Sequence, residues 1–277
     1  MPALTREATS KAVQTANFNL HYHEAGSGDP VVMTHGGGPG ASGWGSNRWV
    51  FDAFSAKHRT ILIDLPGFGG SQPVASTEPR DLMNAKAIME MMNALDIPKA
   101  HLVGGPMGAS IIRFAVECGD RLNKLVMASP AGGGVSIFKP QPSEGAKMER
   151  AFYLNPTREA ARRFLELYVY NSALVTDEVV DDRYQDIVDH PQHIENFMKG
   201  ATTIGARLND PVALLGQVKA KALLVWGRDD RSVPLDHALL FLRKLPDAQL
   251  HVFGECGHWP QYEKADEFSN LVLKFLA

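Results

Sequence analysis

A short glycine-rich turn between an apolar strand and an apolar helix constrains this 277-residue chain more than any other stretch. Residues 100–104 are typical of a buried strand, and residues 104–108 spell Gly-Gly-Pro-Met-Gly. Ile111, Ile112 and Phe114 follow as the start of an apolar helix. Other strands in the chain also alternate with helices. The sequence therefore predicts an α/β fold, with a mostly parallel sheet and helices on both faces.

The central position of this turn lacks a nucleophile. Enzymes that present a serine on such a strand-turn-helix carry Gly-x-Ser-x-Gly at these five positions. Pro106 stands at the central position here, and its ring has no hydroxyl to attack a carbonyl. Proline also fixes φ near about −65°, whereas a turn that exposes its central side chain uses an unusual backbone conformation. We therefore expect the turn to differ in shape as well as in chemistry.

Composition limits the class of protein. The chain is 44% hydrophobic and 21% charged, which is ordinary for a globular protein of one large domain, or of a core with an inserted lid. A net charge of −3 gives no electrostatic reason to expect a nucleic acid or membrane partner. No apolar run reaches the roughly 18 residues of a membrane span, and no secretory signal is visible. Cys118 and Cys256 lack metal or disulfide spacing, so we expect a cytoplasmic protein.

Hydrophobic periodicity predicts the elements of the core. Alternation over 17–24, followed by a turn over 25–30, indicates an antiparallel hairpin with the next strand. The predicted strands are 17–24, 31–34, 59–64, 100–104, 124–128, 221–226 and 249–253, and the predicted core helices are 81–96, 235–244 and 262–276.

The pattern changes in the middle of the chain. No strand signal occurs for about 80 residues after Gly134. Helix signals cover 143–153, 157–170, 177–189 and 191–205 instead. This predicts a core made of residues 1–134 and 207–277, with residues 135–206 inserted as an all-helical lid.

A second glycine-rich loop follows the predicted strand 31–34. Residues 35–44 read HGGGPGASGW, and five of them are glycine. Such a loop brings backbone N–H groups close to a ligand. A flexible surface loop is the alternative, but ligand sites of α/β sheets lie at the carboxyl ends of strands, where this loop begins.

Acidic and histidine side chains follow the last two predicted strands. Asp229 and Asp230 end the strand 221–226, and His258 ends the strand 249–253. A carboxylate that holds an imidazole in one tautomer makes the histidine a base, and the order acid then histidine is that of a catalytic triad. Alone, an aspartate in a turn caps backbone amides. Two such residues after successive strands favour a catalytic pair, with either aspartate as the acid.

At these motifs the chain resembles a known family. HGGGPGASGW, DLPGFG, GRDDRSVPLDHA and HVFGECGHWPQYEKADEF are similar to segments of the meta-cleavage-product hydrolases. These are C–C bond hydrolases of the α/β-hydrolase fold, which cut vinylogous 1,5-diketones formed by ring cleavage of aromatic compounds. The likeness covers nearly the whole chain. It departs at the turn, where the family reads Gly-Asn-Ser-Met-Gly-Gly.

The resemblance implies roles for individual residues. His258 would be the general base with Asp230, rather than Asp229, as its partner. Backbone N–H groups of Gly37 and Met107 would form an oxyanion hole. The substrate-binding residues would be Gly36, Asn47, Arg183 and Trp259. Arg183 could instead be a solvated helix charge, and Trp259 a plain core residue.

Three hypotheses for the function remain. The first is a hydrolase of aromatic-derived dienoates whose cleavage is weak or driven by His258, because Pro106 replaces the serine. The second is a tautomerase or lyase that uses His258 as base, and the third is a non-catalytic binding protein. Ser110 and Cys256 are candidate substitutes for the nucleophile, but both are expected to be structural. The resemblance implies no metal or organic cofactor, and it implies a homo-oligomer.

Overall fold

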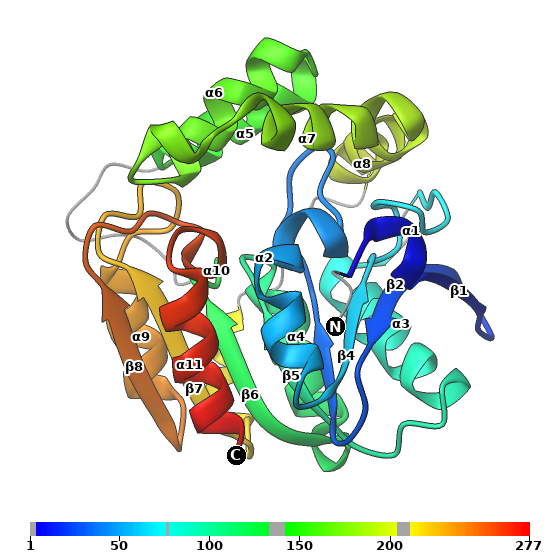
Figure 1. The fold of residues 1–277 in the computed structure, drawn as a ribbon, viewed down its shortest axis with the longest axis vertical. Helices are drawn as coiled ribbons and strands as arrows, with labels where there is room; N and C mark the ends of the chain where they lie inside the picture. Colours follow the sequence, from blue (N-terminus) through cyan, green and yellow to red (C-terminus); the bar gives the residue numbers. More distant parts are fainter. Residues whose placement is uncertain (1–3, 76–77, 133–141, 204–210) are drawn as a thin grey trace.

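An eight-stranded sheet forms the centre of the molecule (Figure 1). The computed structural model describes residues 4–75, 78–132, 142–203 and 211–277. The strand order is β1-β2-β4-β3-β5-β6-β7-β8, and every pairing from β4 to β8 is parallel. The strands are β1 Ser10–Gln14, β2 Asn19–Ala25, β3 Pro30–Met33, β4 Arg59–Ile63, β5 Ala100–Gly104, β6 Leu122–Ala128, β7 Lys221–Gly227 and β8 Ala248–Phe253. This confirms the predicted mostly parallel α/β architecture.

The predicted hairpin between β2 and β3 is wrong. Strand β2 pairs antiparallel with β1 on one side and with β4 on the other, so β4 lies between β2 and β3. The turn residues 25–30 reverse the chain, but a reversal does not make its flanking strands neighbours. Gly26, at φ 81°, packs against the end of helix α2 (Gly43–Ser55), and a Cβ there would lie 2.2 Å from the His58 carbonyl oxygen. The chain therefore passes around the α2–β4 connection.

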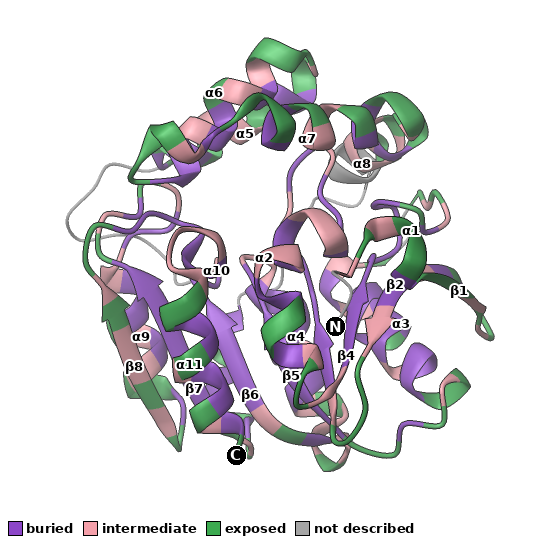
Figure 2. Cartoon of the chain, viewed as in Figure 1, coloured by how far each residue is buried: buried purple, intermediate pink, exposed green. Residues whose placement is uncertain are grey.

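Helices cover both faces of the sheet because side chains alternate along each strand. Val32 joins the apolar cluster beneath α3, α4 and α9, while Val31 and Met33 join the cluster beneath α2 and α11. Figure 2 shows the central strands buried between these layers. The helices are α1 Arg6–Thr9, α2 Gly43–Ser55, α3 Arg80–Ala94, α4 Gly108–Glu117, α5 Glu144–Leu154, α6 Arg158–Tyr168, α7 Asp177–Asp189, α8 Pro191–Thr203, α9 Asp236–Lys244, α10 Pro260–Glu263 and α11 Ala265–Leu276. Short 3-10 turns are η1 Gly119–Arg121, η2 Ser172–Leu174, η3 Pro211–Ala213 and η4 Leu215–Gln217.

Helices α5 to α8 form a separate layer above the carboxyl ends of the strands (Figure 1). Thr157 and Thr176 begin α6 and α7 as N-caps, each accepting a hydrogen bond from a backbone N–H three residues on. The layer has its own apolar cluster, which includes Phe152, Phe164 and Val180. The predicted lid boundaries, at 134/135 and 206/207, and the end of the predicted helix 191–205 lie outside the described residues.

Ion pairs join this helical layer to the core. Arg6 donates to Asp182 at 3.1 Å and to Asp186 at 2.6 Å, and Arg48 donates to Asp182 at 2.8 Å. The two acids lie on α7, whereas the arginines lie on α1 and α2. The N-terminal helix therefore helps to hold the layer over the sheet.

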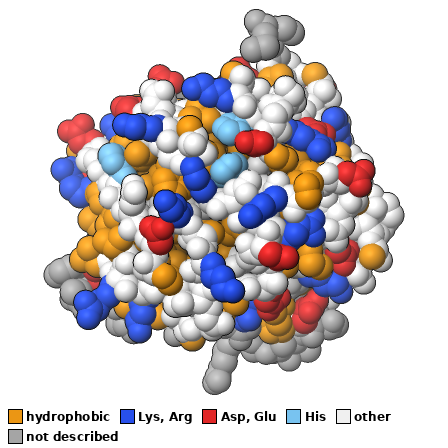
Figure 3. Space-filling model, turned by 90° about the horizontal axis from the view of Figure 1, so that it is seen from below, with side chains coloured by type: hydrophobic (Ala, Val, Ile, Leu, Met, Phe, Trp, Pro, Cys, Tyr) orange, Lys and Arg blue, Asp and Glu red, His pale blue; other side chains and the backbone are white. Residues whose placement is uncertain are grey.

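The face opposite the helical layer carries no single sign of charge. Figure 3 shows Lys, Arg, Asp and Glu side chains interspersed with apolar ones on this face. The mixture agrees with the small net charge of −3. Among the described residues, no helix is both long and apolar enough to cross a bilayer.

Candidate active site

The turn between β5 and α4 is packed too tightly for larger residues at its glycines. A Cβ at Gly104 would lie 1.8 Å from the Ile111 side chain, and one at Gly108 would lie 2.4 Å from Pro130. None of residues 104–108 has a positive φ. The Pro106 ring faces the other glycine loop, because a Cβ at Gly36 would lie 3.0 Å from its Cδ. Residue 106 thus reaches the carboxyl edge of the sheet without a left-handed backbone.

His258 and Asp230 form a buried pair at this edge. The His258 Nδ1 lies 2.7 Å from the Asp230 Oδ2, and the two side chains are 1% and 0% exposed. The other carboxylate oxygen of Asp230 accepts hydrogen bonds from the backbone N–H groups of Ser232 and Val233, at 2.7 and 2.9 Å. Both oxygens are therefore engaged, which fixes the carboxylate and makes Nδ1–H the donor to it.

This geometry decides between the two candidate aspartates. The Asp229 side chain pairs with Arg228 on the surface, with 3.2 Å between Oδ2 and the guanidinium Nη2. It does not contact the histidine. The Nε2 of His258 is buried and has no hydrogen-bond partner among the described residues. The imidazole therefore has one nitrogen held by Asp230 and one available to a ligand.

A cavity of about 320 Å³ lies between the sheet edge and the helical layer. His258 and Pro106 both line it, as do Gly37 and Met107. Tyr168, at the end of α6, covers the histidine: the two rings are 4.6 Å apart, and the His258 N–H donates to the Tyr168 carbonyl. Other lining residues are Gly38, Phe68, Arg80, Ala146, Glu149, Phe197, Val233 and His237.

The two predicted oxyanion-hole residues reach the same cavity. Gly37 comes from the glycine-rich loop after β3, and Met107 immediately precedes α4. Among the described residues, neither backbone N–H donates a hydrogen bond. Met107 also stands at the positive end of the α4 dipole. Both groups therefore have the chemistry needed to bind an oxyanion.

Arg183 reaches down from α7 to the glycine loop. Its Nε donates to the Pro39 carbonyl at 2.5 Å, and its Nη2 donates to the Gly37 carbonyl at 3.2 Å. Arg183 also lines a small space of about 20 Å³ together with Gly36, Pro106, His258 and Trp259. The guanidinium is therefore part of the site rather than a solvated helix charge.

Of the two other predicted substrate-binding side chains, Trp259 lines the small space beside His258, whereas Asn47 lines neither cavity. Trp259 walls the small space beside His258, and its indole N–H donates to the Ser46 carbonyl at 3.3 Å. Asn47 is buried and lines neither cavity. Its amide donates to the carbonyls of Thr34 and Gly43. Asn47 therefore supports the glycine loop from behind.

Neither candidate substitute nucleophile is hydrogen-bonded to the His258 Nε2, which has no partner among the described residues. Ser110 lies in the first turn of α4 and lines the cavity, but its hydroxyl accepts a hydrogen bond from the Asn84 amide at 3.1 Å. The Cys256 thiol is fully buried, and burial raises its pKa far above the usual range. A thiol that stays protonated is a poor nucleophile.

Two charged residues of the cavity were missed at the sequence level. Arg80 begins α3, donates to the Pro66 carbonyl, and lies between the rings of Phe68 and Phe197. Glu149 lies on α5. Glu149 follows Ala146 by three residues and precedes Phe152 by three, so a charge on the apolar stripe of a lid helix was the available signal.

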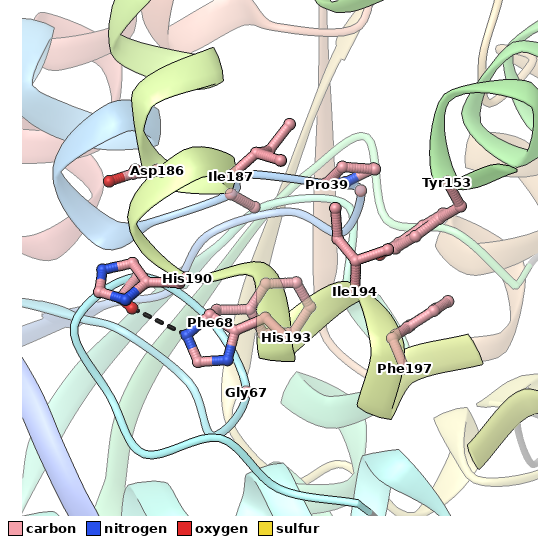
Figure 4. Close-up of a pocket in the computed structure, with 14 residues that line it drawn as sticks. Pro39, Gly67, Phe68, Tyr153, Asp186, Ile187, His190, His193, Ile194 and Phe197 are labelled. Atoms are coloured by element: carbon pink, nitrogen blue, oxygen red, sulfur yellow. Dashed lines mark hydrogen bonds between the residues drawn. The ribbon is translucent and has the colours of Figure 1, made fainter. Parts of the chain in front are cut away.

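A second, narrower pocket marks the seam between the helical layer and the core loops. Figure 4 shows His193 and Ile194 of α8 facing Phe68, with Tyr153 and Phe197 side by side. The His193 Nε2 donates to the Gly69 carbonyl at 2.9 Å. This pocket has room for about 20 Å³, roughly one water. Within the described ranges, no cluster of His, Cys, Asp or Glu could hold a metal ion.

Comparison with known proteins places this fold and site in a class. Residues 31–271 match the model of the alpha/beta hydrolase family. A 2-hydroxy-6-oxo-6-phenylhexa-2,4-dienoate hydrolase of Burkholderia cepacia is 44% identical over 100% of this chain and 99% of its own. A 2-hydroxy-6-oxononadienedioate/2-hydroxy-6-oxononatrienedioate hydrolase of Comamonas testosteroni is 42% identical, with the same coverage. The chain is therefore an α/β hydrolase by fold.

Similar solved structures narrow the class within the α/β hydrolases. A meta-cleavage product hydrolase from Pseudomonas fluorescens IP01 superposes with a TM-score of 0.85 at 31% identity, covering 96% of each chain. A 2-hydroxy-6-oxo-6-phenylhexa-2,4-dienoate hydrolase from Rhodococcus superposes with a TM-score of 0.83 at 27% identity. It covers 97% of this chain and 100% of that one. Within the α/β hydrolases, this chain belongs to the meta-cleavage-product hydrolases.

Proposed function

We propose that this chain acts on 2-hydroxy-6-oxodienoate ring-cleavage products, and that it does so without a covalent intermediate at residue 106. The observation that carries the proposal is that Pro106 and His258 line the same cavity, and that the His258 Nε2 has no hydrogen-bond partner among the described residues. The histidine retains its aspartate, and the Gly37 and Met107 N–H groups remain. These groups support the proposal of a base and an anion site in one cavity, whereas Pro106 carries no attacking hydroxyl.

The chemistry then depends on proton transfer by His258. Its Nε2 takes a proton from the substrate or from a water, and Asp230 stabilises the imidazolium that forms. For cleavage, the water oxygen bonds to the C6 carbonyl carbon, whose oxygen is held by the N–H groups of Gly37 and Met107. The ketone form of the substrate carries two hydrogens on C5. Its C5–C6 bond then breaks, the electron pair shifts through C4 and C3 to the C2 oxygen, and that oxygen takes the proton from the imidazolium. The products are a carboxylic acid and a 2-hydroxydienoate.

Loss of the nucleophile sets the expected rate. Triad deletions in serine hydrolases leave a residual acceleration of about 10³–10⁴ over water, from the oxyanion hole and binding.

The same site carries a second candidate reaction, dienol-to-ketone tautomerisation. This reaction needs a base but no nucleophile. We assign binding of the substrate carboxylate to Arg183, because its guanidinium lines the small space beside His258 and guanidinium groups form strong charge-assisted hydrogen bonds with carboxylates.

The test is a turnover assay on coloured dienolates with product analysis. Substrates with a phenyl and with a carboxylated side chain are compared, because both kinds are named among the relatives. Release of an acid and a dienoate supports hydrolysis, and bleaching with an intact carbon skeleton supports tautomerisation. A spectral shift without turnover supports a binding protein and contradicts the proposal.

Variants at two positions sharpen the assay. His258→Ala is expected to abolish either reaction, and unchanged turnover in this variant would refute the role of the base. Pro106→Ser is expected to raise cleavage at least tenfold, because it restores a hydroxyl within the cavity that His258 lines. Pro106→Ala is the matched control, since it removes the ring without adding the hydroxyl, and it is expected to leave cleavage near the wild-type rate.

A further inference from the structure

We propose that Glu149 is a second proton-transfer residue of the cavity and delivers a proton to C5 of the dienolate, while His258 acts as the base. This inference rests on the proposed function, because it assigns the proton donor for the same dienolate substrate. His258 enters the cavity from the loop after β8, on the side of the sheet. Glu149 enters from α5 in the helical layer (Figure 1).

The geometry of α5 directs this carboxyl inward. Ser143, Ala146 and Glu149 recur every three residues, and all three line the cavity. The Glu149 Oε1 lies only 3.3 Å from the position that a Cβ on Gly37 would take. The carboxyl therefore stands directly over the glycine loop that is predicted to bind an oxyanion. A leucine or phenylalanine would suffice to fill this position, so a carboxyl is costly unless it is used.

Within the part of the chain that the structure describes, Glu149 has no structural partner that would explain its charge. It makes no hydrogen bond or ion pair with a described residue. Arg183 is the nearby cation, but its Nε and Nη2 already donate to the Pro39 and Gly37 carbonyls. An ionisable group that lines a cavity without a structural partner is a candidate for chemistry.

Burial favours the protonated form of the Glu149 carboxyl. Burial raises the pKa of the Glu149 carboxyl, although the charges of Arg183 and His258 oppose this. Tyr153 on α5 and Tyr168 on α6 also face it, and burial raises the pKa of both phenols, so they stay neutral. Glu149 therefore holds a proton at a higher pH than an exposed glutamate does. A buried carboxylic acid kept neutral can donate a proton or a hydrogen bond.

The proton transfers balance without any further reactant. The His258 Nε2 takes the proton of the 2-hydroxyl, and the C2–O bond becomes a carbonyl as the diene electrons shift toward C5. Glu149 gives its proton to C5, and the new C5–H bond completes the ketone. The imidazolium then returns its proton to the Glu149 carboxylate through water. In the cleavage that follows, C5 already carries the proton from Glu149. The C5–C6 electron pair therefore shifts through C4 and C3 to the C2 oxygen, which takes its proton from the imidazolium.

The experiment compares wild-type protein with Glu149→Gln, which keeps the shape of the side chain and removes its acid. General acid catalysis contributes about 10²–10⁴ in rate, so we expect dienolate bleaching to slow about 100-fold with KM unchanged within threefold. The wild-type rate should fall at high pH as Glu149 loses its proton, and this limb should be absent from the variant. In D₂O, wild-type protein should place deuterium on one face of C5, and the variant on both faces.

A control and two contrary outcomes complete the test. Glu144→Gln alters an exposed carboxyl on the same helix and should leave the rate and the pH profile unchanged. A Glu149→Gln variant with the wild-type rate, pH profile and deuterium placement would overturn the role of Glu149 and leave the proposed function standing. A wild-type protein that neither bleaches nor binds the dienolate would overturn the proposed function, and this role with it.

Discussion

Single side chains decide the chemistry of this site more than its overall shape does. Asp230 uses one carboxylate oxygen for His258 and the other for two backbone N–H groups. The neighbouring Asp229 pairs with Arg228 at the surface. The adjacent side chains of Asp229 and Asp230 therefore have different partners, a surface arginine for the first and the buried His258 for the second. The difference comes from the turn after β7, which points one carboxylate into the core and the other outward.

This difference gives a prediction for the pair. Asp230→Asn removes the charge that stabilises the imidazolium, and the corresponding change in a serine protease costs about 10⁴ in kcat. We expect turnover that depends on His258 to fall at least 100-fold, measured on the dienolate. Asp229→Asn is the matched control and should keep the wild-type rate. Equal losses in the two variants would contradict the assignment of the acid.

At the scale of elements, close packing at strand ends places the catalytic loops. Gly227 ends β7, and a Cβ there would lie 1.8 Å from the Gly257 carbonyl oxygen and 2.5 Å from that of Cys256. These are backbone atoms of the segment that carries His258, so they cannot move aside cheaply. The approach of this segment to β7 brings the histidine to Asp230. A glycine at the end of one strand thus sets the position of a side chain that follows the next strand.

Gly227→Ala tests this packing. The added methyl group must push residues 256–258 away, and overpacking at backbone typically costs about 1–3 kcal/mol or more. We expect a destabilisation of about 3 kcal/mol in chemical unfolding, together with loss of the histidine-dependent turnover. Gly119→Ala serves as the control, because nothing lies within 4 Å of the Cβ it would add. If both variants behaved like the wild-type protein, the tight approach at Gly227 would not be what positions His258.

Prediction from sequence worked well for most strands and for the lid helices, but it failed for the pairing of β2 and did not find β1, α1 or α2. The strands and lid helices were foreseeable because apolar periodicity is a local property of the chain. The pairing of β2 was not, because β4 follows β2 by more than 30 residues and yet lies between β2 and β3. The strand β1 and the helix α1 are only five and four residues long. The start of α2 was missed because its N-cap Ser42 and first residues belong to the glycine-rich stretch that was assigned to a loop.

The molecule as a whole buries histidines that do not line the large cavity. His23, His35 and His101 are all buried, and burial lowers the pKa of each imidazole from 6.5 to about 4. His35 shows how the neutral form is used: its Nδ1–H donates to the Gly36 carbonyl and its Nε2 accepts from the Leu65 N–H. Protonation would break the second bond. The folded state therefore resists binding protons that the unfolded chain accepts readily.

The resulting pH dependence has a definite sign. Between pH 6.5 and about 4 the unfolded chain binds more protons, so stability falls as the pH falls through this interval. Each such histidine removes up to about 1.4 kcal/mol per pH unit. His101→Phe removes one of the three, and the Nδ1 of His101 makes no hydrogen bond with the described residues. We expect the loss of Tm between pH 7 and pH 5 to be about 3–6 °C smaller in this variant. An unchanged loss would contradict the contribution of His101.

By itself the sequence determined the sheet of alternating strands and helices, and the clustering of glycine loops, acid and histidine at the carboxyl ends of strands. Both follow from local patterns and from the shared direction of parallel strands. It also determined that Pro106 lacks a hydroxyl. Only the tertiary structure decided which aspartate meets His258, that Asn47 turns away from the cavity, and that Glu149 enters it. Those outcomes depend on contacts between segments distant in the chain, where packing rather than local periodicity selects the neighbour.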